Sequence, residues 1–157
     1  MVGQIGSSTL ISDPVLFIRD SLKSNITDPI SSKRSTSDSA FVMTSFPQKN
    51  VMYPMLIVKS TGPTQNKRLG MQSQQSWMDI PIEVRVWGRN VVERDSLSQQ
   101  VFAYLQKNQF GTGSQTIPFG LHDFNLISNI PIDDVDENGK DTGIRTQQMR
   151  YNWKAII

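Results

Sequence analysis

The sequence predicts an α+β domain in which two helices cover one face of a mostly antiparallel four-stranded sheet. Three observations lead to this prediction. Residues 78–86 alternate apolar and polar side chains with period two, which is typical of a half-buried strand. Two segments, Asp13 to Ile26 and Asn90 to Leu105, repeat apolar residues at helical spacing. The elements follow one another as helix, hairpin, helix, hairpin, and this order favours both helices on the same side of the sheet.

Length and composition favour one soluble domain over residues 1–157. The 157 residues contain no cysteine, which excludes disulfide frameworks, thiolate zinc sites and cysteine nucleophiles. The net charge of +2 is too small to imply a nucleic-acid partner. No apolar run approaches the ~18 residues that cross a bilayer, and the N-terminus lacks the pattern of a secretory signal. We therefore expect no membrane partner.

The N-terminal part is expected to form an arm followed by a helix. Residues 1–12 are small and polar, and we expect them to order only against the body of the protein or a neighbour. The helix begins at Asp13-Pro14, because aspartate can cap a helix and proline fits its first turn. Its apolar stripe consists of Val15, Leu16, Ile18, Leu22 and Ile26.

A long loop is predicted from residue 27 to residue 50. It is rich in serine and threonine but carries Phe41 and Phe46, which a purely solvated loop would not need. Two interpretations stay open. The phenylalanines pin the loop to its own sheet, or they dock on another protein subunit.

The first predicted hairpin joins residues 51–60 to the alternating strand. The segment from Tyr53 to Val58 is apolar at every position, which is typical of an inner strand covered on both faces. Thr61-Gly62-Pro63 interrupts it, and a polar tip carrying Lys67 and Arg68 precedes the return into the alternating strand.

The alternating strand has one apolar face and one mixed face. Met78, Ile80, Ile82, Val84 and Val86 form the apolar face. The other face carries Trp77, Glu83, Arg85 and Trp87, a set that we interpret as a candidate subunit interface. The alternative is that both tryptophans pack under loops of their own chain. Gly88 then ends the strand, and Asn90 is expected to cap the second helix.

The second hairpin is predicted from residue 121 to the C-terminus. Phe124, Leu126, Ser128, Ile130 and Ile132 should share one face of its first strand. In its second strand the alternation places Met149, Tyr151 and Trp153 on one side. The turn between the strands, residues 133–143, is acidic.

No catalytic, metal-binding or cofactor-binding constellation emerges from the sequence. The only histidine, His122, has no nucleophile motif near it. Asp134, Asp136 and Asn138 match the start of a calcium loop, but Arg145 occupies the position that requires a bidentate glutamate. No phosphate-binding loop is present. We therefore expect a protein that is not an enzyme and that holds no metal or cofactor.

Three segments together resemble the tail terminator proteins of tailed bacteriophages and related archaeal viruses, which are also called tail completion or head-tail joining proteins. The segments are YPMLIV at Tyr53 to Val58, WMDIPIEVRVWG at Trp77 to Gly88, and the helix from Asn90 to Leu105. The resemblance assigns no role to the acidic turn at residues 133–143.

The resemblance implies a virion structural protein of the tail and neck, assembled in the host cytoplasm. Such proteins form a ring, generally a hexamer, that caps the tail tube, ends its polymerisation and joins the tail to the head. The implied partners are other copies of the chain, the tail tube protein and the head-tail connector or stopper protein. The genome would pass through the lumen without sequence-specific contacts. Candidate contacts with tube or connector are Lys67, Arg68, Phe41 and Phe46. The alternative function is a small α+β module that binds a ligand or nucleic acid on its sheet face.

Overall fold

The computed structural model describes residues 12–34, 40–48, 51–68, 76–108, 121–135 and 141–156. The predicted N-terminal arm therefore lies outside the described residues, apart from Ser12. The elements in chain order are α1 (Ser12–Asn25), β1 (Val42–Met43), β2 (Met55–Ser60), β3 (Thr64–Arg68), β4 (Ser76–Gly88), α2 (Val91–Asn108), β5 (Leu121–Val135) and β6 (Asp141–Ile156). Within this part of the chain, neither helix has the length and apolar character needed to cross a membrane.

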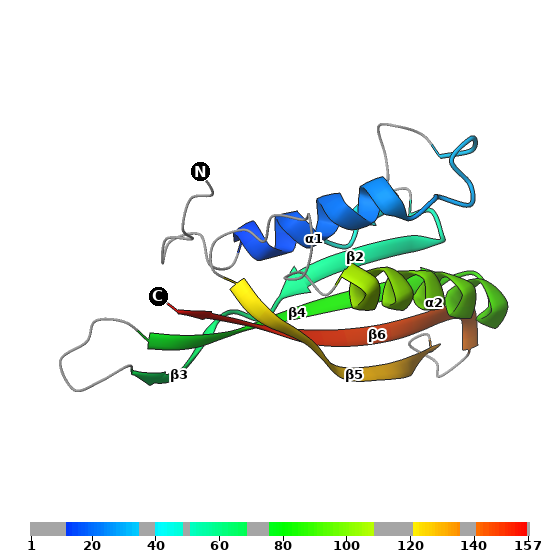
Figure 1. Ribbon diagram of the computed structural model, residues 1–157. Coiled ribbons are helices and arrows are strands. Elements are labelled where there is room, and N and C mark those ends of the chain that lie inside the picture. Colours follow the sequence, from blue (N-terminus) through cyan, green and yellow to red (C-terminus); the bar gives the residue numbers. More distant parts are fainter. Residues whose placement is uncertain are drawn as a thin grey trace.

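The fold is α+β, and both helices lie on one face of a six-stranded mixed sheet (Figure 1). The strand order is β1-β2-β4-β6-β5, and β3 pairs with the beginning of β4, residues 76–79. Strand β1 runs parallel to β2, whereas the other pairs are antiparallel. The predicted four-stranded, mostly antiparallel sheet is therefore wrong.

Two short strands account for the error in the predicted sheet. Strand β1 has only two residues, too few to show a period, and the Leu56 N–H donates to the Phe41 carbonyl beside it at 2.7 Å. Strand β3 has the sequence TQNKR, without any apolar residue, so it resembles a hairpin tip. Gly62, with φ +102°, turns the chain between β2 and β3, and Ser60 Oγ accepts a hydrogen bond from its N–H at 3.1 Å.

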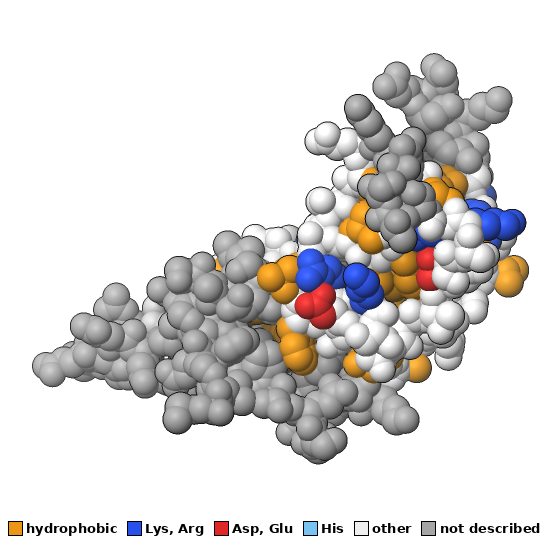
Figure 2. Space-filling model, turned by 90° about the horizontal axis from the view of Figure 1, so that it is seen from above, with side chains coloured by type: hydrophobic (Ala, Val, Ile, Leu, Met, Phe, Trp, Pro, Cys, Tyr) orange, Lys and Arg blue, Asp and Glu red, His pale blue; other side chains and the backbone are white. Residues whose placement is uncertain are grey.

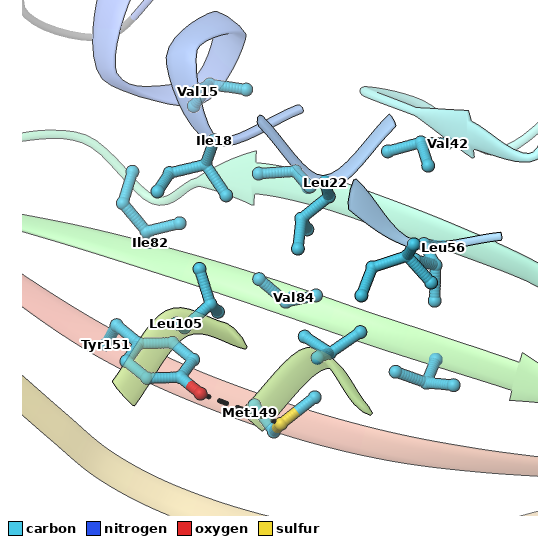
Figure 3. Close-up of a cluster of buried hydrophobic side chains, with 14 of the residues drawn as sticks. Val15, Ile18, Leu22, Val42, Leu56, Ile82, Val84, Leu105, Met149 and Tyr151 are labelled. Atoms are coloured by element: carbon cyan, nitrogen blue, oxygen red, sulfur yellow. Dashed lines mark hydrogen bonds between the residues drawn. The ribbon is translucent and has the colours of Figure 1, made fainter. Parts of the chain in front are cut away.

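The core lies between the helices and the even-numbered side chains of β4, as the alternation predicted (Figure 3). Val84 has no exposed surface, and neither do Ile18 and Leu22 of α1. Helix α2 contributes Leu97, Val101 and Leu105, and β6 contributes Met149, Tyr151 and Trp153. The prediction that Leu16 belongs to this core is wrong, because its side chain is 38% exposed.

Strand β5 departs from its predicted alternation. Phe124 is buried, but the register against β6 shifts between Leu126 and Ser128. A bulge of this kind places an extra residue in one strand and reverses the facing of those that follow. Ser128 is aligned with Arg150, on the face away from the helices, so the predicted single apolar face is wrong. Two apolar side chains of this strand, Ile127 and Ile130, are consequently 65% and 48% exposed.

The turn from β4 into α2 is tightly packed. Asn90 caps α2 as predicted, since its Oδ1 accepts a hydrogen bond from the Glu93 N–H at 2.8 Å. Gly88 lies so close to the first turn of α2 that a Cβ atom there would be 2.7 Å from the Arg94 backbone nitrogen. The strand can therefore pass directly into the helix only if residue 88 has no side chain.

We expect Gly88→Ala to lower the free energy of unfolding by roughly 2–3 kcal/mol, because α2 must shift to admit the methyl group. Urea denaturation measures the change. Ser96→Ala, an exposed substitution on the same helix, serves as control and should stay within ~0.5 kcal/mol of the parent protein. Equal stabilities for the parent and Gly88→Ala would contradict this packing.

Candidate functional site

The face of the sheet opposite the helices carries a group of polar and charged side chains. Alternation and register bring β2, β4 and β6 together there, with Glu83 aligned with Lys59 on one side and Arg150 on the other. We call this surface the open face. It consists of Lys59, Asp79, Pro81, Glu83, Arg85, Gln148, Arg150 and Asn152.

Glu83 is the centre of the open face. Its side chain is buried although no helix covers it, and the residue is only 4% exposed. Gln148 Nε2 donates a hydrogen bond to Glu83 Oε2 at 2.7 Å, and Arg85 Nε donates to Oε1. Lys59 Nζ lies 3.5 Å from Oε1, and Arg150 Nε lies 3.6 Å from Oε2. Three cations therefore converge on one carboxylate.

The helix side of the molecule has a different charge arrangement. In Figure 2, which looks down on that side, the visible acidic groups of the described residues lie next to basic ones. Two helix ion pairs join sequence neighbours, Arg19 with Asp20 and Arg94 with Asp95, each at 2.7 Å. Such one-to-one exposed pairs balance their own charge. The open face, by contrast, gathers the three cations Lys59, Arg85 and Arg150 around Glu83, and its second carboxylate is Asp79.

The environment of Glu83 lowers the pKa of its carboxyl group. Burial alone would raise this pKa, but the hydrogen bonds from Gln148 and Arg85, together with the positive charges of Arg85 and Lys59, outweigh it. Because the folded-state pKa lies below the usual value of 4.5, ionised Glu83 contributes stability above about that pH. That contribution is lost as the pH falls through the lowered pKa.

Glu83→Gln should therefore destabilise the protein at neutral pH by about 2 kcal/mol, the size of a charge-assisted hydrogen bond. The difference between the parent and the variant should shrink as the pH falls below 4.5, because the carboxyl group is protonated first in the unfolded state and then, at its lowered pKa, in the folded state. Urea unfolding at pH 7 and pH 3.5 measures both values. A difference that does not change with pH would contradict the role of the ionised group.

A groove of about 420 Å³ adjoins the Glu83 cluster. Arg150 and Asn152 of β6 line it on one side, and Thr61 and Thr64 line it near β3. The exposed side chain of Ile127 adds an apolar wall. Asp79 and Glu83 of β4 also line the groove. The groove therefore combines one cation, two carboxylates, hydrogen-bonding groups and apolar surface, which suits an extended polar segment better than a wholly apolar ligand.

The four predicted interface residues occupy different surroundings. Glu83 and Arg85 are joined by an ion pair. Trp87 contacts rings of its own chain, with centroids 5.3 Å from Phe46 and 6.3 Å from Tyr53. Trp77 lies at the opposite end of β4, aligned with Lys67 of β3. The structure thus favours intrachain packing for Trp87. Of the four residues, only Glu83 and Arg85 contact each other.

The other predicted contact residues are also separated. Phe41 belongs to the core, 8% exposed, and the Arg34 guanidinium lies 5.5 Å from its ring centroid. Phe46 is 45% exposed and packs on Trp87. Lys67 and Arg68 are part of β3 rather than a free tip, and their side chains lie outside the described residues. The loop's phenylalanines therefore serve its attachment to its own sheet.

Three residues of the Glu83 cluster were not identified from the sequence, namely Lys59, Gln148 and Arg150. In the sequence, these residues are recognisable only as members of the polar faces of their own strands. The register between the strands is what brings them to Glu83. Among the described residues, no group of three or more His, Cys, Asp and Glu side chains could hold a metal ion. The side chains of His122 and of the calcium-loop candidate Asp134, and the whole of Asp136, lie outside that part.

No family model matches the chain, and a comparison with curated proteins finds no match.

Proposed function

We propose that this protein is a virion structural subunit of the tail terminator type, which assembles into a ring that caps the tail tube and joins it to the head connector. The observation that carries the proposal is the two-sided sheet. One face is packed against the helices over β1, β2, β4 and β6, and the other presents a fixed charge cluster beside the exposed Ile127 and Ile130. A ring subunit needs such a surface for its neighbour and needs no catalytic group.

The layout of the resembling segments gives further support. They correspond to β2, β4 and α2, which pack on one another: β2 pairs with β4, and α2 covers the apolar face of β4. In addition, β3 and the beginning of β4 extend past the N-terminal end of α1 (Figure 1). An extension of this kind is suited to reach a partner above or below a ring.

The proposal is tested by mass measurement and by a capping assay. We expect the purified chain to form a closed ring, a hexamer by the resemblance, visible in negative-stain images and in sedimentation velocity. Added to polymerising tail tube protein, it should shorten the tubes. A chain that stays monomeric and leaves tube length unchanged would refute the proposal.

The positive charge of the open face specifically favours one second candidate, a nucleic-acid-binding module. Lys59 and Arg150 have side chains that are 43% and 56% exposed, so both can contact phosphate. Fluorescence anisotropy with single-stranded oligonucleotides at several salt concentrations tests it. Binding that weakens steeply with salt and is lost in Arg150→Gln would support this candidate over the ring.

A further inference from the structure

We propose that a groove between α2 and β5 is the docking site of the arm that precedes α1, residues 1–11 of the same chain. This groove lies on the helix side of the sheet, opposite the open face, and we call it the helix-side groove. The inference goes beyond the proposed function, because it concerns the closure of a single subunit and applies with or without a ring.

The helix-side groove has a polar end and an apolar end. Helix α2 packs on β4 and β6, whereas β5 lies beyond it at the edge of the sheet. The polar end has a volume of about 310 Å³, and its lining includes Asp95, Ser98, Gln99, Asn129 and Gln147. The adjoining apolar end, of about 190 Å³, is lined by Phe102, Leu105, Phe124 and Leu126 among others. Phe102 lines both ends, so the two hollows form one groove.

The polar end suits an uncharged segment that carries hydrogen-bonding groups. Ser98 is only 8% exposed, and its Oγ has no hydrogen-bond partner among the described residues. A docked carbonyl or hydroxyl group would relieve the cost of that buried hydroxyl. The amides of Gln99 and Asn129 offer both donors and acceptors. Asp95, the only charged residue of the described lining, is already paired with Arg94 at 2.7 Å.

The composition of the arm matches this lining. Residues 1–11 read MVGQIGSSTLI and contain no Asp, Glu, Lys, Arg or His. Leu10 and Ile11, next to α1, suit the apolar end, where Leu126 is 39% exposed. The serine, threonine and glutamine residues that precede them suit the hydroxyl and amide groups of the polar end.

The arm joins the described structure beside the apolar end. Helix α1 begins at Ser12, and the ring centroid of Phe17 in its second turn lies 6.0 Å from that of Trp153. The Trp153 ring is in turn 4.8 Å from the ring of Phe124, which lines the apolar end. In Figure 1 the start of α1 and the start of β5 lie toward the same end of the molecule. Eleven extended residues span up to ~36 Å, and the groove follows α2 for roughly 16 Å, so the arm can reach and follow it within one subunit.

Residues 109–120 are the other segment beside the apolar end, because they join α2 to β5. Asn129 is eight residues along β5 from Leu121, a distance of roughly 26 Å. Since residues 109–120 are attached at both ends, they could reach the polar end and return only by extending almost fully. The arm is joined to the described structure only through Ser12, so it meets no such limit.

Cross-linking of the full chain tests the docking, because the chain contains no cysteine and only introduced thiols react. One variant carries Gln4→Cys with Asn129→Cys, and the matched control carries Gln4→Cys with Ile130→Cys. The two second positions are neighbours in β5, but Asn129 lines the helix-side groove, whereas Ile130 is aligned with Gln148 on the open face. Each variant is treated with a short bismaleimide, and mass spectrometry of the digested protein measures the linkage.

We expect an intrachain cross-link to Asn129→Cys roughly tenfold more often than to Ile130→Cys, because docking raises the effective concentration of one thiol beside the other. Equal yields in the two variants would overturn the inference. Covalent dimers in place of the intrachain link would overturn it as well, because the arm would then dock on a neighbouring copy.

Thermolysin, which cleaves before apolar residues such as Leu10 and Ile11, gives an independent measurement. Leu126→Glu puts a charge into the apolar end and should raise the rate of cleavage within the arm roughly tenfold, because cleavage follows the population of the undocked arm. Ile127→Glu, the adjacent residue on the open face and 65% exposed, should be cleaved like the parent. Circular dichroism confirms that both variants are folded.

Equal cleavage of the parent and both variants would overturn the docking. Neither measurement depends on assembly, so a failure of the docking leaves the ring proposal untouched, and a monomeric parent chain refutes the ring without refuting the docking.

Discussion

Val84→Asp is expected to unfold the protein or to lower its free energy of unfolding by about 4 kcal/mol or more. Val84 lies in the middle of β4 with no exposed surface, between Ile82 and Val86 along the apolar face. A carboxylate there would have no cation or hydrogen-bond donor to pair with among its core neighbours. Either the charge is buried at high cost, or the helices separate from the sheet.

The measurement is chemical denaturation of purified protein, with the soluble yield as a first indication. Val92→Asp is the matched control, because Val92 is 78% exposed in the first turn of α2, where a negative charge is tolerated. We expect the control to stay within ~0.5 kcal/mol of the parent. A stable, folded Val84→Asp protein would contradict the assignment of the even-numbered face to the core.

The inside and outside of β4 could be predicted because residues 78–86 alternate apolar and polar side chains without interruption. Helix α1 shows that an apolar stripe in the sequence predicts the buried residues of a helix less reliably. Val15, Ile18, Leu22 and Ile26 are spaced by three or four residues and are buried together. Leu16 is two residues from Ile18, which turns it about 200° away around the helix axis, and its side chain is exposed.

The rest of the sheet could not be predicted from local pattern. Strand β3 pairs with β4 through backbone hydrogen bonds. Its polar sequence, TQNKR, has no alternation of apolar and polar side chains that would predict a strand. The bulge in β5 is likewise fixed by its pairing with β6, so the alternation at residues 124–132 suggested a single face. Local pattern shows which residues alternate but not where the register shifts.

The candidate site was predictable in part for the same reason. Glu83 and Arg85 lie on one strand, two residues apart, so their proximity follows from the strand itself. Lys59 and Arg150 are 24 residues before and 67 residues after Glu83 in the sequence, and only the register aligns them with it. Charge patterning within one strand thus identified the centre of the cluster but not its full charge.

Arg34 is a further residue whose importance the sequence did not reveal, since it lies in a segment rich in serine and threonine. Its side chain is only 6% exposed and forms an ion pair with Asp28 at 2.7 Å. The guanidinium also donates to the Met52 carbonyl at 3.1 Å and to the Pro54 carbonyl. One side chain therefore ties the start of the long loop to the segment that leads into β2.

The loss of this guanidinium should be costly because its partners are themselves buried. The Asp28 side chain is only 14% exposed. Without Arg34, its carboxylate would stay largely buried and would lose its ion pair. Two backbone carbonyls would lose a donor at the same time. The Phe41 ring would also lose the cation that lies over it.

We therefore expect Arg34→Met, which keeps most of the side-chain volume, to lower the free energy of unfolding by roughly 3–5 kcal/mol. Arg19→Met is the matched control, because Arg19 pairs with a 62% exposed Asp20 and such a pair contributes at most about 1 kcal/mol. Equilibrium urea unfolding measures both. Since Arg34 also holds the loop that carries Phe46 against Trp87, the tryptophan fluorescence, to which Trp87 contributes, should change in Arg34→Met before global unfolding and stay unchanged in the control. Equal stabilities for the two variants would show that the loop is held by its phenylalanines alone.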